Sequence, residues 1–128
     1  MTILFADVAG STALGEQLDP ERLRDVLDSF FAAMRREIEA EGGIVEKFIG
    51  DAVVAVFGVP TAHEDDPTRA LRAALRMRRS LDRLNRSLED VHAIRLAMRI
   101  GVNTGVVVAR AIPGPGEGFV TGDAVNVA

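Results

Sequence analysis

The chain has 128 residues, of which 48% are hydrophobic and 27% are charged, and its formal net charge is −4 at pH 7. A chain of this size can bury a core of its own, whereas an acidic chain without a basic tract is a poor partner for nucleic acid. It has no cysteine, which excludes disulfides and thiolate metal sites, and no segment that resembles a signal peptide or a membrane span, so we expect one cytoplasmic domain over residues 1–128 that makes no membrane contact of its own.

The first quarter of the chain predicts a strand followed by a long helix. Residues 2–8 are nearly all apolar, as in a short strand that is buried on both faces. Residues 9–18 predict a loop with a short helical turn. Asp19 and Pro20 then mark a helix start, because aspartate caps helices and proline suits the first helical position. Apolar residues at spacings of three and four continue this helix to about residue 41.

A β-hairpin is expected next. Residues 44–49 and 52–57 predict two strands, and the Gly50-Asp51 pair between them is a tight-turn signal. Taken alone, Asp51 is more simply explained as a turn residue than as a ligand, because aspartate is common in turns.

A second helix follows the hairpin. Asp66 and Pro67 repeat the helix start, and Glu64–Asp66 are expected to form a solvated acidic cap. The amphipathic pattern then runs to about Leu88. Apolar and polar residues alternate over residues 94–100, which indicates a half-exposed strand.

The end of the chain predicts a second hairpin. Residues 101–105 read as a turn or bulge and residues 106–112 as a strand. The Pro-Gly repeat at 113–116 is typical of a flexible tip, and residues 119–121 favour a returning strand. Asp123 is expected to cap a last helix.

The order βαββαβ plus a hairpin predicts an α+β fold with a ferredoxin-like core. In such a sheet the third strand lies between the first and second, so the end of strand one neighbours the start of strand three. Asp7 and Asp51 occupy those two places, beside a loop of small residues. A divalent metal that carries phosphates needs carboxylates arranged in this way. The pair therefore points to phosphoryl or nucleotidyl chemistry.

Four segments in order carry a family resemblance. They are residues 5–12 (FADVAGST), 43–51 (GIVEKFIGD), 99–105 (RIGVNTG) and 120–128 (VTGDAVNVA). Together they resemble class III nucleotidyl cyclases, in particular bacterial members of the actinobacterial type. One such segment would be weak evidence, but four in order across nearly the whole chain are a strong signal.

The resemblance implies a reaction and a metal site. Family members convert a nucleoside triphosphate to a 3′,5′-cyclic nucleotide and pyrophosphate, using two Mg²⁺ or Mn²⁺ ions on two aspartates that match Asp7 and Asp51. For this chain we expect ATP as the substrate and cyclic AMP as the product. The loop after Asp7 would bind the phosphates through backbone amides. Its residues are Val8, Ala9, Gly10, Ser11 and Thr12. The family forms its sites at a homodimer interface, with metals from one chain and base-binding residues from the other.

The nucleotide-binding residues match less cleanly. The lysine that reads the base matches Lys47, and the asparagine that orients the ribose in catalysis matches Asn126. The second base-reading position holds Phe119, which cannot accept the hydrogen bond that aspartate or threonine accepts from adenine in adenylyl-specific members. ATP is still the expected substrate, but Phe119 leaves GTP as an open alternative.

The resemblance also implies that residues are missing at the end. The family's transition-state arginine would follow Ala128, and the family's final helix and terminal hairpin would follow it in turn. We therefore expect a C-terminally truncated domain, and activity of this chain by itself stays open. Loss of such a charge-stabilising group costs on the order of a hundredfold in rate.

Two other functions remain open from the sequence. One is a degenerate cyclase-like domain that binds nucleotide or a partner to regulate attached domains without turnover, which Phe119 favours. The other is a different nucleotidyl-transfer enzyme on the same palm-like core. The Gly-Gly-Asp/Glu-Phe signature of dinucleotide cyclases is missing, and the acidic composition disfavours a polymerase relative.

Overall fold

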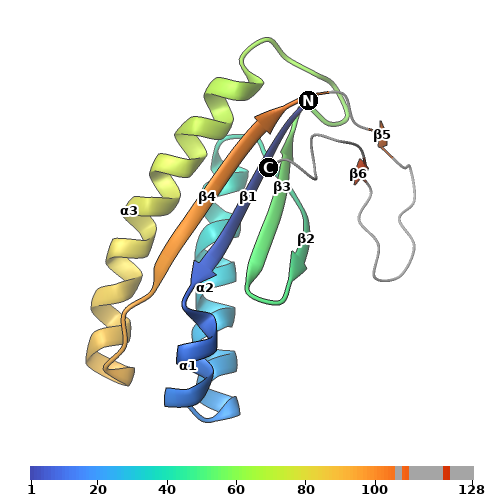
Figure 1. Ribbon diagram of the computed structural model, residues 1–128. Coiled ribbons are helices and arrows are strands. Elements are labelled where there is room, and N and C mark those ends of the chain that lie inside the picture. The colour runs from blue at the N-terminus through green and yellow to red at the C-terminus, as the bar shows by residue number, and fades with distance from the viewer. Residues whose placement is uncertain (106–107, 110–119, 122–128) are drawn as a thin grey trace.

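The computed structural model describes residues 1–105, 108–109 and 120–121, and it has two layers (Figure 1). A four-stranded antiparallel sheet has the order β2-β3-β1-β4. Its strands are β1 (Thr2–Ala9), β2 (Ile44–Ile49), β3 (Ala52–Phe57) and β4 (Ala97–Thr104). This order confirms the ferredoxin-like prediction, because β3 lies between β1 and β2 and is antiparallel to both.

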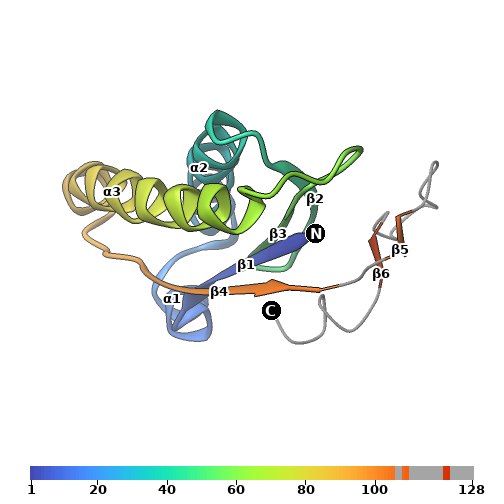
Figure 2. The same cartoon turned by 90° about the horizontal axis from the view of Figure 1, so that it is seen from above.

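Two long helices cover one face of this sheet (Figure 2). They are α2 (Pro20–Ala40) and α3 (Asp66–His92), and a short helix, α1 (Ser11–Gln17), follows β1. The predicted start of α2 is confirmed, since the Asp19 side chain accepts a hydrogen bond of 2.9 Å from the Arg22 amide. Among the described helices, none is long and apolar enough to cross a membrane.

Buried and partly buried residues alternate along β1, so one face of the strand points into the core and the other points away from it. Leu4, Ala6 and Val8 are buried and pack in the main core under the helices. Phe5 and Asp7 lie between them and are only partly buried. Because successive side chains of a strand point to opposite faces, Asp7 lies on the face that α2 and α3 leave uncovered.

Strand β4 differs from the sequence prediction at both ends. It begins at Ala97 and not at residue 94, and it continues through Gly101 to Thr104, where a turn or bulge was expected. The reason is its long ladder with β1, in which Gly101 pairs with Phe5 and Thr104 pairs with Thr2. Pairing to a full-length neighbour strand overrides the local preference of glycine for turns.

The second hairpin is described only where its strands pair. Strands β5 (Val108–Ala109) and β6 (Val120–Thr121) form a separate antiparallel pair, with Val108 opposite Thr121. They lie within the segments predicted as an outgoing and a returning strand. The predicted tip at 113–116 and the helix after Asp123 lie outside the described residues.

The buried Asn85 ties α3 to the segment that leads into β4. Its amide donates to the Leu96 carbonyl at 2.9 Å, and its Oδ1 accepts from the Leu96 amide at 2.8 Å, while Asn85 is only 2% exposed. Asn85→Ala leaves both Leu96 groups without these partners, so we expect it to lower the free energy of unfolding by about 2 kcal/mol. Urea unfolding measures this loss. The neighbouring exposed Arg86→Ala is the control, and an equal effect of the two variants would contradict the prediction.

Candidate functional site

The sheet brings Asp7 and Asp51 to the same end of adjacent strands. Asp7 pairs with Ala52 at the start of β3, and Asp51 is the turn residue just before Ala52. The Val8 amide also donates to the Asp51 carbonyl at 3.2 Å, across the same edge. The strand order expected from the sequence thus places the backbone of Asp7 and that of Asp51 at the same end of two neighbouring strands.

Both acids stand next to open turns formed by glycines. Gly10 and Gly50 have left-handed φ values of 75° and 57°, which glycine adopts without strain. A β-carbon built on either residue would meet no described atom within 4 Å. The described atoms therefore leave space at the Cα of Gly10 and at that of Gly50.

Arg99 binds Asp7 in this site, although the sequence alone predicts no role for it. It lies on β4 directly opposite Asp7 in the β1–β4 ladder. Its Nε donates to Asp7 Oδ1 at 3.1 Å and its Nη2 donates to Asp7 Oδ2 at 3.0 Å. The hydrogen bonds and charge of Asp7, with a further contribution from the charge of Asp51, raise the pKa of Arg99 above its ordinary value. The antiparallel register is the signal that could have found it, since Asp7 and Arg99 are cross-strand partners.

The predicted phosphate-binding loop divides into two parts. Val8 and Ala9 belong to β1, and the Val8 amide is already used by the Asp51 carbonyl. Gly10 caps α1, which starts at Ser11 and includes Thr12. The first amides of a helix have no acceptor within the helix. The backbone amides of Gly10, Ser11 and Thr12 are therefore the better candidates for a phosphate.

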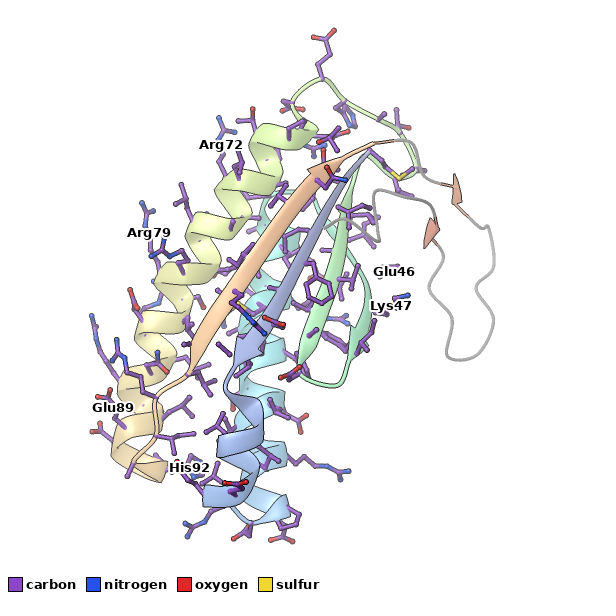
Figure 3. The ribbon with its side chains drawn as sticks, in the orientation of Figure 1. Glu46, Lys47, Arg72, Arg79, Glu89 and His92 are labelled. Atoms are coloured by element: carbon purple, nitrogen blue, oxygen red, sulfur yellow. The ribbon has the colours of Figure 1, made fainter. Side chains whose placement is uncertain are left out.

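Lys47 and Asp7 lie on strands that are separated by β3. Lys47 lies on β2, the edge strand, opposite Val54 of β3, and the ladder shifts register between Val45 and Lys47. Its ammonium is 3.8 Å from a carboxylate oxygen of the adjacent Glu46, and its side chain is 31% exposed. Figure 3 shows both side chains on β2. The other two predicted nucleotide-binding residues, Phe119 and Asn126, lie outside the described residues.

The donor set at the strand ends fits a divalent metal that is shared with a phosphate ligand. Carboxylate oxygens are hard ligands, and Mg²⁺ commonly binds through one or two carboxylates plus substrate phosphates and water. Asp7 and Asp51 supply two such carboxylates. Among the residues that the structure describes, no group of three His, Cys, Asp or Glu side chains could hold a metal by itself. Two carboxylates leave further coordination positions of such an ion to water or to a phosphate ligand.

Sequence comparison relates the chain to one family. A family model described as the adenylate and guanylate cyclase catalytic domain matches residues 1–128. An adenylate cyclase of Anabaena cylindrica is 35% identical over 134 residues, which cover 100% of this chain and 26% of that protein. A terminal-differentiation-specific adenylate cyclase of Dictyostelium discoideum is 32% identical over 131 residues, which cover 100% of this chain and 6% of that protein. The chain thus spans a small part of the curated relatives that it matches.

Structure comparison finds both guanylyl and adenylyl cyclases among the similar structures. The crystal structure of the guanylyl cyclase Cya2 aligns with a TM-score of 0.90 and 35% identity, over 98% of this chain and 64% of that chain. The adenylyl cyclase CyaB from P. aeruginosa aligns with a TM-score of 0.90 and 29% identity, over 99% of this chain and 67% of that chain. The fold and the sequence therefore indicate the same family, but they do not decide between adenine and guanine as the base of the nucleotide.

Proposed function

The chain belongs to the adenylate and guanylate cyclase catalytic domain family, and from this premise we propose that the protein converts ATP to 3′,5′-cyclic AMP and pyrophosphate. The observation that supports this most is the pairing of Asp7 and Asp51 at one edge of the sheet, beside the open Gly10 and Gly50 turns. A site of this kind binds a triphosphate together with divalent ions.

The residues take distinct roles in this proposal. Asp7 and Asp51 would hold two Mg²⁺ or Mn²⁺ ions, which would supply charge neutralisation for the phosphates and lower the pKa of the ribose 3′-hydroxyl. The backbone amides of Gly10, Ser11 and Thr12 donate to the phosphates, whereas the Val8 amide keeps its hydrogen bond to the Asp51 carbonyl. Asn126 orients the ribose, so that the 3′-oxygen attacks the α-phosphate in line with the leaving pyrophosphate. Lys47 and Phe119 contact the base.

A homodimer accounts for the position of Lys47. Within one chain Lys47 lies on the edge strand, with β3 between it and Asp7. The sheet face that carries Asp7 is not covered by α2 or α3 (Figure 2). We propose that a second copy packs over this face, and that its Lys47 reads the base of the nucleotide held by Asp7 and Asp51.

Mixing two inactive variants tests this shared site. In the full-length protein, Asp7→Ala removes a metal ligand and Lys47→Ala removes a base contact, so we expect each to be less active alone. If the two residues act from different chains, a mixed dimer keeps one intact site. Random exchange should then restore about a quarter of the wild-type activity. Activity in the mixture that only equals the average of the two variants would contradict the homodimer proposal.

The choice of base needs a direct assay. Cya2 is a guanylyl cyclase and CyaB an adenylyl cyclase, so the neighbours do not decide it. The full-length protein with Mn²⁺ should be incubated with ATP and GTP separately, and both cyclic products measured by chromatography. We expect more cyclic AMP than cyclic GMP. An excess of cyclic GMP would replace ATP by GTP in the proposal, and no product from either would favour the alternative of a degenerate domain that only binds nucleotide or a partner.

A further inference from the structure

We propose that Arg99 competes with the divalent metal for the carboxylate of Asp7. Arg99 is then a positioning residue that holds this carboxylate when no divalent ion is bound. The inference rests on the proposed role of Asp7 and Asp51 as metal ligands. It adds a residue that the metal must displace, and it predicts that removal of a positive charge strengthens metal binding at this site.

The geometry of the pair carries the inference. The guanidinium of Arg99 engages both oxygens of Asp7, at 3.1 and 3.0 Å, in the two-pronged arrangement that suits arginine and carboxylate. A divalent ion needs at least one of those oxygens. Metal and guanidinium therefore compete for the same acceptor atoms.

The contact between Arg99 and Asp7 follows from the backbone pairing of β1 and β4. Asp7 and Arg99 are opposite each other in the β1–β4 ladder, so their side chains leave the same face of the sheet. The charge of Asp51 also acts favourably on Arg99. Arg99 thus binds the Asp7 carboxylate directly and interacts through its charge with Asp51.

Exposure explains how the guanidinium can be displaced. The Arg99 side chain is 73% exposed, whereas that of Asp7 is 21% exposed. An exposed ion pair is weak and is screened by salt. The pair should therefore lower metal affinity several-fold without blocking the site, and the arginine can swing into solvent when the metal binds.

A Mn²⁺ titration without nucleotide tests the competition. The full-length wild type is compared with Arg99→Gln, and free Mn²⁺ is followed by electron paramagnetic resonance at low ionic strength. Asp7→Asn in each background identifies the binding that belongs to this site. We expect Arg99→Gln to bind Mn²⁺ about five- to tenfold more tightly, because it frees the acceptor and removes a nearby positive charge. The difference should shrink as salt is added.

Arg95→Gln is the matched control. Arg95 is also an exposed arginine, close to β4 in the sequence, but it pairs with Glu89 at 2.9 Å and not with Asp7. It changes the net charge by the same amount, so we expect less than about a twofold change in the Mn²⁺ dissociation constant. Arg99→Lys keeps the charge without the two-pronged contact and should lie between wild type and Arg99→Gln.

The possible results separate this inference from the proposed function. Asp7-dependent binding that is equal or weaker in Arg99→Gln would overturn the competition and leave the metal site standing. An equal gain in Arg95→Gln would also overturn it, since the effect would then be general electrostatics. No Asp7-dependent binding in either background would overturn the metal site itself, and the competition with it.

Discussion

Asp7→Ala is expected to lower cyclic nucleotide formation by the full-length protein at least about a hundredfold, because it removes one of the two carboxylates that would hold the divalent ions. The initial rate with saturating Mn²⁺ and ATP measures the loss. The variant should fold normally, because Asp7 is not buried in the core and its partner Arg99 is 73% exposed, so the guanidinium left behind stays hydrated.

Two controls make this result specific. Asp25→Ala removes an exposed acid of α2 and should keep nearly full activity. Thermal unfolding of Asp7→Ala should stay close to that of the wild type. If Asp7→Ala keeps more than about a tenth of the activity, Asp7 does not hold an essential metal, and the proposed role of this residue fails.

The parts of the fold that local signals determine follow the sequence closely. Asp19 caps α2 and Pro20 opens it, as the Asp-Pro pair indicates. The Gly50-Asp51 turn joins β2 and β3, as the spacing between two apolar runs indicates. In each case the decisive interaction lies within a few residues of the signal, so no knowledge of distant partners is needed.

The parts that were missed depend on pairing between distant segments. Gly101 reads locally as a turn, yet it lies inside β4 because β1 offers it a partner, Phe5. Arg99 has no neighbour in the sequence that would reveal its role. Its contact with Asp7 exists because the two strands pair in one register, and a shift by one residue would place it on the opposite face. The sequence could thus suggest the two aspartates, whose positions follow from strand order, but not the arginine, whose position follows from register.

Asp66 shows the same limit at the start of α3. The Glu64–Asp66 run was expected to be a solvated acidic cap, but Asp66 is only 2% exposed. Its Oδ2 accepts from the His63 amide at 2.9 Å, and its Oδ1 accepts a short hydrogen bond from Arg69. Asp65, the residue at the cap position, makes no side-chain cap hydrogen bond. Asp66 is therefore not a solvated cap. It is a buried anchor, that is, a buried carboxylate that holds the loop before α3 through the His63 amide.

Asp66→Ala is therefore expected to lower the free energy of unfolding at pH 7 by about 3 kcal/mol. It leaves the His63 amide without its acceptor, and it takes the buried carboxylate away from the Arg69 guanidinium, which keeps its pairing with the exposed Asp65. Asp65→Ala is the matched control. Asp65 also pairs with Arg69, at 3.4 Å, but its side chain is 61% exposed, so its loss should cost less than about 1 kcal/mol. Urea unfolding compares the two variants, and equal losses would contradict the buried-anchor interpretation.

The pH dependence of this difference gives an independent check. Burial by itself raises the pKa of Asp66, but the hydrogen bond from the His63 amide, the hydrogen bond and charge of Arg69 and the charge of His63 outweigh it, so the pKa lies below its ordinary value of 3.8. A carboxyl with a lowered folded pKa stabilises the fold above its unfolded pKa, and this contribution is lost as the pH falls through the folded value. The gap between wild type and Asp66→Ala should hold from pH 7 down to about pH 4 and narrow below it. A gap that stays constant into that acid range would mean that the charge of Asp66 does not carry its contribution to stability.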